Sequence, residues 1–403
     1  MFNLPKNIIF CSKCVMSNQR PASIPEFLHT KSRKNAKYLN IEKNKKGDYI
    51  CDACKVATLK ENINWGQRKK ELIKLLNKYR SKKGDYDCVV PGSGGKDSVY
   101  AAHILKYQYG MNPLTVTWPP IMYTDYGYQN FKNWIEIGGF DNITFKQNGK
   151  VQKLLTKLSI INLLHPFQTF ILGQKNIGPR IAAKYNIPLV FYGEPEAEYG
   201  NSRKEFTALR ENKYWLSDKK NKLYLAGTPI QDLIKTYKLN FNDLKPYLPL
   251  DKSEMGNKNV KVHYLGYYLK WIPQEAYYYA SEHTNFKARP YRTQGTYSKY
   301  NSIDDKIDDL HYFTTFIKFG IGRTTYDASQ EIRNKHLTRD EAIKLVKRFD
   351  GEFPDKYLDE VLEYLNIKKD KFLKLIDMFR PPHLWKKKKN KWVLRNSIYR
   401  KKI

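Results

Sequence analysis

The sequence lacks any long apolar run. Its 403 residues contain no hydrophobic stretch near the ~20 residues that a membrane-spanning helix needs. The N-terminus also lacks a cationic segment followed by an apolar one, which is the pattern of a secretory signal. We therefore expect a cytoplasmic protein without a membrane partner.

Acidic residues are scarce relative to basic ones. The chain has 40 Asp and Glu against 72 Lys and Arg, which gives a formal net charge of +32. Such an excess suits an anionic substrate or a nucleic acid. Heavy use of Lys, Asn, Tyr, Ile and Phe along the whole chain is equally typical of an AT-rich genome. The 41% hydrophobic content excludes a disordered chain, but the charge alone does not choose a partner.

Cysteine is also scarce, and four of the five cysteines form two C-x-x-C pairs, Cys11 with Cys14 and Cys51 with Cys54. Two such pairs can supply four thiolates to a tetrahedral Zn²⁺ site, although a redox dithiol or an iron–sulfur cluster uses the same residues. A closed four-thiolate site has no open position, so we expect a structural metal. The fifth, Cys88, lies in an apolar segment typical of a buried strand, which leaves no cysteine pair for sulfur transfer.

A glycine-rich loop follows that strand and precedes a helical pattern. It reads Gly92, Ser93, Gly94, Gly95, Lys96, Asp97 and Ser98. A strand, glycine turn and helix point backbone N–H groups at an anion, and glycine permits close approach of the backbone. The serines supply hydroxyl groups, Lys96 a positive charge, and Asp97 a carboxylate suited to Mg²⁺.

The loop sequence S-G-G-x-D-S resembles that of the PP-loop ATP pyrophosphatases. The resemblance implies an adenine nucleotide alpha hydrolase-like α/β fold, in which the loop grips the β,γ-pyrophosphate of ATP while a substrate oxygen attacks the α-phosphorus. It also implies that the next strand, with Thr117, presents its backbone to adenine. The periodicity predicts a doubly wound, mostly parallel sheet, with strands near 113–118, 142–147 and 188–192 and helices near 128–137, 151–164 and 174–185.

Three glutamates follow the strand at 188–192. Alternation would place Glu194, Glu196 and Glu198 on one side if the segment stays extended, where they could hold Mg²⁺ or orient ammonia; an exposed acidic loop is the alternative. Arg180, just before that strand, could face the nucleotide or lie on an exposed helix surface.

A second dense polar patch lies between residues 287 and 299. Donors around a glycine favour a loop that binds an anionic, polyhydroxylated ligand, and a basic surface loop is the alternative. We predict as substrate-binding residues Arg289, Arg292, Thr293, Gln294 and Tyr297. Ser302 and Thr338 each begin a capping-box pattern that predicts a helix start, and the lysines at 386–389 are expected to be solvated tail charges.

Together, the paired C-x-x-C, SGGKDS, FYGEPEAEYG, RPYRTQGTYSKYNSIDD and GIGRTTYDASQEIR segments resemble the N-acetyl sugar amidotransferase family, the PseA- and WbpG-like enzymes of bacterial surface glycans such as O-antigen and pseudaminic acid on flagellin. The resemblance implies conversion of an acetamido group, on a free nonulosonic acid or a nucleotide-linked sugar, to an acetamidino group with ATP and ammonia. Catalysis would then fall to Lys96, Asp97 and Glu194. We expect a zinc-ribbon module at 1–64, an ATP pyrophosphatase domain at 65–300 and a helical region at 301–403.

The source of ammonia follows from the cysteines. A glutaminase needs an activated Cys, and here residue 2 is Phe, four cysteines are assigned to metal and Cys88 lies in a strand. We therefore predict a separate glutaminase subunit. The main alternative is a PP-loop tRNA-modifying enzyme, a thiolase or a lysidine-type ligase. The thiolase lacks the cysteines it needs, whereas the ligase needs none; tight binding of tRNA would favour that class, and we expect no nucleic-acid partner.

Overall fold

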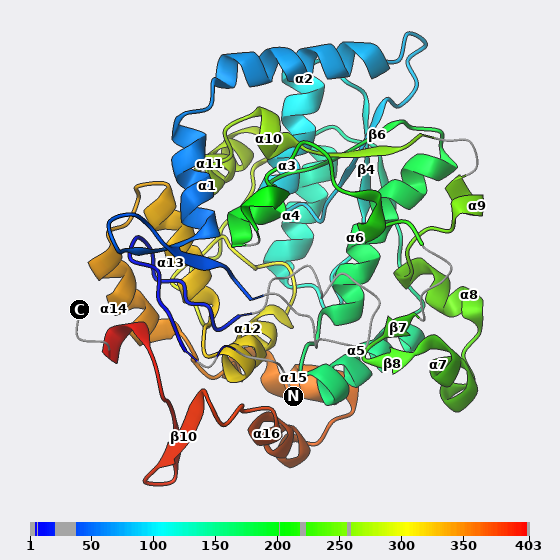
Figure 1. Ribbon diagram of the computed structural model, residues 1–403. Helices are drawn as coiled ribbons and strands as arrows, with labels where there is room; N and C mark the ends of the chain where they lie inside the picture. Colours follow the sequence, from blue (N-terminus) through cyan, green and yellow to red (C-terminus); the bar gives the residue numbers. More distant parts are fainter. Residues whose placement is uncertain are drawn as a thin grey trace.

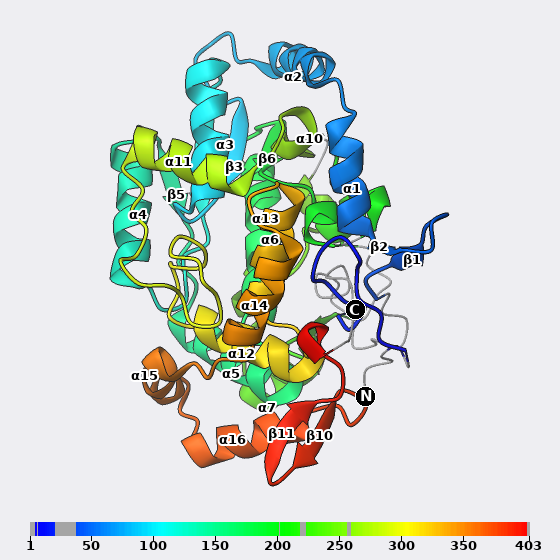
Figure 2. The same cartoon turned by 90° about the vertical axis from the view of Figure 1, so that its left-hand side faces the viewer.

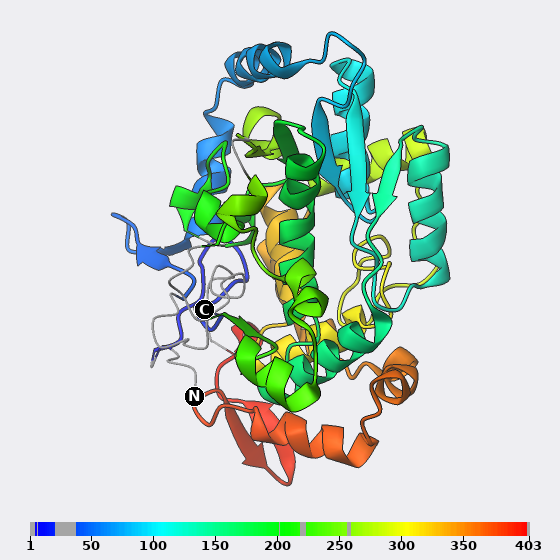
Figure 3. The ribbon, with the colours of Figure 1, turned by 90° about the vertical axis from the view of Figure 1, so that its right-hand side faces the viewer.

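A five-stranded parallel sheet forms the centre of the computed structural model, which describes residues 5, 7–20, 38–200, 202–217, 223–255 and 259–400. The strand order is β5-β4-β3-β6-β9, so the chain starts in the middle, winds to one edge and then to the other. Figure 3 shows strands of this sheet as blue-to-teal arrows that run side by side in one direction. The strands are β3 (Cys88–Pro91), β4 (Pro113–Thr117), β5 (Asn142–Thr144), β6 (Leu189–Tyr192) and β9 (Lys261–Tyr264).

Helices cover both faces of the sheet. They do so because the strands carry apolar side chains on both faces, and both faces must therefore be buried. Val89, Leu114 and Val190 pack in one hydrophobic cluster, and Cys88, Val90 and Phe191 pack in another. Onto the second face pack α2 (Trp65–Tyr79), α3 (Lys96–His103), α4 (Asp125–Glu136) and α11 (Pro273–Thr284). The cluster on the first face contains residues of α5 (Gly149–Leu163) and α6 (Gln168–Lys184), and it continues into α12 (Asp308–Phe319), α15 (Asp355–Leu365) and α16 (Lys369–Met378). The predicted doubly wound sheet is confirmed.

The N-terminal module lies beside the C-terminal helices. It consists of the two cysteine pairs, the hairpin β1 (Ile41–Lys43) and β2 (Tyr49–Cys51), and α1 (Asp52–Glu61). Its cysteines share a hydrophobic cluster with Phe319 and Ile321, next to α13 (Arg323–Arg333) and α14 (Arg339–Phe349). Figure 2 shows this blue module beside the orange helices. The predicted division of the chain at residues 64 and 300 stays a prediction.

The remaining elements lie around this centre. Short segments between β6 and α11 form β7 (Tyr224–Leu225), β8 (Thr228–Pro229), α7 (Ile230–Tyr237), α8 (Phe241–Leu244), α9 (Lys252–Met255) and α10 (Leu265–Tyr268). The chain ends in the hairpin β10 (Trp385–Lys388) and β11 (Lys391–Leu394), which with α16 lies at the end of the molecule opposite α2 (Figure 1). None of the described helices has the length and apolar character needed to cross a bilayer.

Two local expectations differ from the structure. Thr338 forms the predicted capping box at the start of α14, but Ser302 does not begin a helix: its φ is 54°, and α12 begins only at Asp308. The lysines at 386–389 are exposed, as expected, but they belong to the β10–β11 hairpin and not to a tail, because Trp385 buries its ring and anchors the first strand.

Candidate active site

The glycine-rich loop has the conformation of an anion-binding turn. It joins β3 to α3 at the middle of the sheet, where the chain order reverses and ligands bind beyond the strand ends. A side chain at Gly92 would place its Cβ 2.2 Å from the Cβ of Ser98, and Gly94 has φ +85° with Phe131 backbone 2.6 Å from an added Cβ. No side chain caps the start of α3, which leaves its first N–H groups for a ligand.

The side chains of the loop are fixed by close polar partners. The Lys96 ammonium donates to Asp97 Oδ2 at 2.6 Å, and Ser98 Oγ donates to the Gly95 carbonyl at 2.9 Å. Ser93 Oγ donates to Asp304 Oδ2 at 2.8 Å. Asp304 therefore joins the C-terminal region to the loop across 211 positions of sequence. Sequence reasoning quoted the segment that contains Asp304 but assigned it no role.

A cavity of about 390 Å³ opens at this loop. Its walls come from the whole 92–98 loop, from Gln174 and Lys175 of α6, from the end of β6 and from the C-terminal region. The last two contributions include Gly193, Glu194, Glu196, Tyr300, Asn301, Ser302, Ile303, Asp304, Arg323 and Gln330. Residues far apart in the sequence thus share one site of the size that small-molecule ligands occupy.

Two carboxyl groups in the cavity repel each other. Burial raises the pKa of Glu194 to about 8, and the neighbouring Asp97 carboxylate adds to this effect while Lys96 opposes it. Asp97 Oδ1 is buried without a hydrogen-bond partner within the described part of the chain. Paired carboxylates with a free buried oxygen beside a phosphate-binding loop are a donor set that suits Mg²⁺. Asp97 and Glu194 thus fit the metal that the loop motif implies.

The three glutamates do not share one side, because residues Glu196–Tyr199 turn in a 3-10 helix instead of staying extended. Glu196 lines the cavity and pairs with Lys175; burial alone would raise its pKa, but Lys175 and Arg210 outweigh this and lower it. Glu198 leaves the cavity and pairs with Lys60 of α1, with 2.7 Å between Nζ and Oε1. Glu198 therefore does not line the described cavity, and its predicted role in substrate binding stays a prediction.

Two predicted nucleotide contacts also lie elsewhere. Arg180 points to the segment before α9, where it pairs with Glu254 at 2.7 Å and donates to the carbonyls of Lys245 and Leu248. Thr117 is fully buried in the sheet, where its hydroxyl accepts from the Asn142 amide. Neither residue lines the cavity.

The polar patch at 287–299 forms hydrogen bonds with residues 300–304, which line the cavity. Thr293 Oγ1 donates to the Asn301 carbonyl and the Arg289 guanidinium donates to the Ile303 carbonyl, at 3.1 and 3.0 Å. Arg292 forms a bidentate pair with Glu352, and Gln294 bonds Asp355. None of the predicted binding residues of this patch lines the cavity; they are Arg289, Arg292, Thr293, Gln294 and Tyr297. The loop holds residues 300–304 in place at the cavity, and ligand binding by these five residues stays a prediction.

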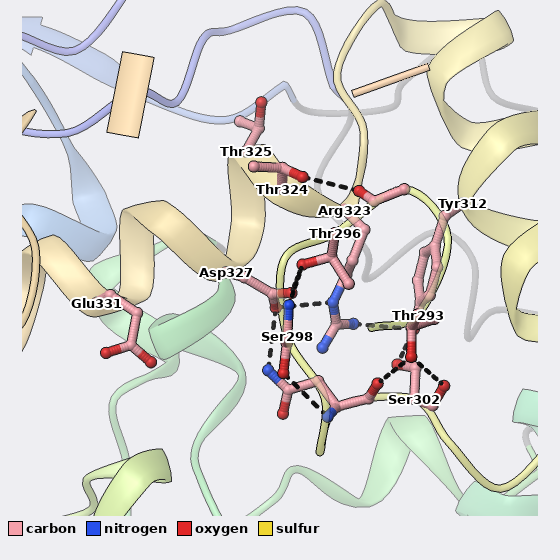
Figure 4. Close-up of polar contacts among 12 residues, drawn as sticks. Thr293, Thr296, Ser298, Ser302, Tyr312, Arg323, Thr324, Thr325, Asp327 and Glu331 are labelled. Carbon is pink, nitrogen blue, oxygen red and sulfur yellow. Dashed lines mark hydrogen bonds and ion pairs between the residues drawn. The ribbon is translucent and has the colours of Figure 1, made fainter. Parts of the chain in front are cut away.

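Sequence reasoning missed Arg323, the first residue of α13. Its Nε donates to Asp327 Oδ1 at 2.7 Å and its Nη1 to the Tyr312 hydroxyl at 3.0 Å (Figure 4). Asp327 also accepts from Thr296 Oγ1 at 2.6 Å, and Tyr312 bonds Ser302. The GIGRTTYDASQEIR segment carried the signal, because an arginine with an aspartate four residues later on a helix forms a fixed pair.

The four cysteines of the N-terminal module form a candidate metal centre. Their sulfur atoms all lie within 4.8 Å of one another, and two of the pairs are 3.8 and 3.7 Å apart. Tetrahedral bonds of ≈ 2.3 Å to Zn²⁺ would place sulfurs about 3.8 Å apart, so the cluster fits this ion. The site lies against the C-terminal helices, since Arg339 of α14 donates to the carbonyls of Cys11 and Cys14.

Comparison with known proteins supports the family resemblance. Residues 294–399 match the family described as LPS biosynthesis protein WbpG-like, C-terminal domain, and this match confirms the predicted resemblance over that part of the chain. No curated protein sequence matches the chain. NMN synthetase from Francisella tularensis aligns with 77% of this chain and 96% of its own, at 14% identity and a TM-score of 0.32, a likeness too loose to support an inference.

The matched region supplies Ser302, Asp304, Arg323 and Gln330 to the cavity that the glycine-rich loop begins. The site therefore combines a nucleotide-type loop with a wall from the region that matches the WbpG-like family model. This combination points to an ATP-dependent enzyme of the PP-loop type.

Proposed function

We propose that the chain is an ATP-dependent amidotransferase that converts an acetamido group of a bacterial surface-glycan sugar to an acetamidino group. The observation that carries the proposal is the shared cavity, in which Ser93 of the loop bonds Asp304 of the WbpG-like region. One cavity of about 390 Å³ brings the phosphate-binding loop within reach of a sugar held by the C-terminal wall.

The reaction balances without a redox partner. An amide carbonyl carbon is a poor electrophile, so the amide oxygen first attacks the α-phosphorus of ATP and pyrophosphate leaves. Ammonia then adds to the activated carbon, loses a proton, and AMP leaves with the former amide oxygen. The products are the acetamidino sugar, AMP and pyrophosphate.

The charged residues of the cavity each have a role in these reaction steps. Lys96 and the N–H groups at the start of α3 stabilise the negative charge that develops on pyrophosphate. Mg²⁺, held by Asp97 with Glu194, would supply further screening of the phosphates. Burial and Asp97 raise the pKa of Glu194 to about 8, and a Mg²⁺ ion between the two carboxyl groups would favour the charged form of both. Glu196 keeps Lys175 at the cavity.

The N-terminal module has a structural role in this proposal. Four buried thiolates leave no open position on Zn²⁺, so the ion would hold the module together and with it the face on which α13 and α14 pack. Ammonia would come from a separate glutaminase subunit.

The direct test is turnover by the purified full-length chain. ATP, Mg²⁺, ammonium and a panel of acetamido sugars should yield AMP and a product in which mass spectrometry shows N–H in place of the carbonyl oxygen. Glutamine in place of ammonium should give no product. Turnover with glutamine and no partner would refute the separate glutaminase, and AMP formation with tRNA but with none of the sugars would refute the proposal.

A further inference from the structure

The end of the chain concentrates positive charge. Residues 368–400 contain twelve Lys and Arg against two Asp and no Glu, a net charge of +10 in a chain whose total is +32. No residue after Asp377 is acidic. This segment forms α16 and the β10–β11 hairpin, which lie together at one end of the molecule (Figure 1). The charge is therefore gathered at one end, whereas a bias in composition alone would spread it along the chain.

The two faces of the hairpin differ in chemistry. On the inner face Trp385 is buried, and its indole N–H donates to the carbonyl of Ile317 in α12 at 2.8 Å. Because side chains alternate along a strand, the cross-strand register places Lys386, Lys388 and Lys391 together on the outer face, where all three are exposed. The hairpin is thus anchored through one face and presents lysines on the other.

The outer face carries a repulsion between like charges. Lys388 and Lys391 are direct cross-strand partners, and like charges at such positions destabilise a hairpin. The hairpin itself has no acidic residue, and within the described part of the chain no ion pair involves these two lysines. An anionic surface placed against this face would relieve the repulsion.

The exposed face of α16 adds both charge and an apolar side chain. Lys371, Lys374 and Met378 recur at spacings of three and four residues, which places them on one face of the helix. All three are exposed, and Met378 is 81% exposed. The other face is buried through Phe372 and Ile376. An exposed apolar side chain among lysines is typical of a helix that lies in a membrane interface.

We propose that this end of the molecule binds the surface of an anionic phospholipid bilayer, with Met378 entering the bilayer, through a basic surface that consists of Lys371, Lys374, Met378, Lys386, Lys388 and Lys391. Lipid phosphates supply negative charge, and lysine binds phosphate as a point charge without a fixed geometry. A nucleic acid suits the surface less, because no Trp, Tyr or Phe among the described residues at 368–400 is exposed for base stacking. The sequence prediction of no membrane partner rests on the lack of a long apolar run, which contact with a bilayer surface does not require.

Co-sedimentation of the full-length chain with vesicles tests the proposal. The vesicles contain phosphatidylcholine alone or phosphatidylcholine with about 30% phosphatidylglycerol, which is anionic. The wild type should sediment with the anionic vesicles and not with the neutral ones at about 0.1 M salt, and about 0.5 M salt should release it, because salt screens the attraction.

A hairpin variant combines Lys386→Gln, Lys388→Gln and Lys391→Gln. It should bind the anionic vesicles roughly 100-fold more weakly, because each lysine near an anionic bilayer contributes about fivefold in affinity. The variant should keep or raise the Tm, since it removes the repulsion between Lys388 and Lys391. The thermal measurement thus shows that lost binding does not come from a misfolded hairpin.

The matched control replaces three lysines of α2 by glutamine, at Lys70, Lys74 and Lys78. These lysines are exposed, their loss changes the net charge equally, and α2 lies at the opposite end of the molecule (Figure 1). The control should change binding by less than about twofold, because these charges lie beyond the screening length of the bilayer. Met378→Gln changes no charge but should weaken binding about tenfold, as expected for an apolar side chain that leaves water.

The proposal is overturned if the wild type binds both kinds of vesicle equally or binds neither, or if the control loses as much affinity as the hairpin variant. Unchanged binding of Met378→Gln would also overturn it, since the partner would then have no apolar interior. Bulk tRNA is added as a competitor: if tRNA binds more tightly than the vesicles through the same lysines, the surface is a nucleic-acid site and the proposal is wrong. Failure of the proposed function leaves these results unchanged, because no part of the experiment requires turnover.

Discussion

The Lys60–Glu198 ion pair offers the sharpest structural prediction. Both side chains are only 8% exposed, and the Lys60 ammonium also donates to the Trp271 carbonyl at 3.0 Å. The pair joins α1, just after the second cysteine pair, to the turn that follows the cavity glutamates. The sequence suggested that Glu198 binds substrate, whereas the structure makes it a structural anchor, and the two roles predict different measurements.

The expected cost follows from burial of an unpaired charge. Lys60→Met leaves the Glu198 carboxylate without its cation, which costs about 3–5 kcal/mol for a buried pair. With an unfolding entropy of about 2.1 cal/mol/K per residue, this lowers Tm by roughly 4–6 °C in a chain of this length. Replacing both residues, as Lys60→Met with Glu198→Leu, removes both charges and should recover most of the loss.

Urea unfolding and calorimetry of the single and double variants measure this cost, and the KM for the sugar is measured beside it. Lys335→Met is the matched control, because Lys335 pairs with Glu61 of the same helix at 2.9 Å but with side chains 79% and 55% exposed; it should leave the free energy of unfolding nearly unchanged. The reasoning is refuted if Glu198→Leu leaves stability unchanged and raises the sugar KM, or if the double variant is as unstable as the sum of the two single variants.

Three further predictions concern the loop, the metal and pH. Ser93→Ala removes the hydrogen bond that holds the loop to Asp304, and the misplaced loop should lower kcat by roughly 100-fold in an AMP-release assay; a change below about threefold would contradict the loop assignment. The purified chain should contain zinc in stoichiometric amount, and its removal by a chelator should lower Tm; a fully stable, metal-free chain with four titratable thiols in the cluster would contradict the structural site. Glu194 has its pKa raised from 4.5 to about 8, so the folded chain holds a proton that the unfolded chain has lost, and the free energy of unfolding from this group falls as pH rises from about 4.5 to 8. Glu194→Gln should remove that fall, and parallel urea-unfolding profiles for the two proteins at pH 5 and pH 9 would contradict the assignment.

Much of the fold could be predicted because its signals are local. The apolar strand before Gly92, the strands that follow and the helices between them give the periodicities of a doubly wound sheet. Gly92 and Gly94 are required because neighbouring atoms leave no room for a side chain at either position, and the glycine-rich pattern predicts such close contacts. The spacing of the two cysteine pairs likewise predicts that they lie close together, because four thiols with that spacing suit one metal ion.

The rest of the site depends on contacts that no local pattern encodes. Glu198 differs from Glu194 only because a 3-10 turn rotates it toward Lys60 of a distant helix. Arg292 and Arg323 look alike in sequence, but the first pairs with Glu352 away from the cavity and the second pairs with Asp327 at the cavity wall. Asp304 reaches Ser93 across the fold, so its role follows only from the tertiary arrangement.

Transfer of the acetamido oxygen tests the central claim most directly. An acetamido sugar labelled with oxygen-18 at the acetamido carbonyl is incubated with the full-length chain, ATP, Mg²⁺ and ammonium, and the nucleotide products are analysed by mass spectrometry. The account predicts that the label leaves the sugar and appears in the phosphate of AMP, while pyrophosphate stays unlabelled. Label retained in the sugar, or AMP formed without label, would contradict attack of the amide oxygen on the α-phosphorus.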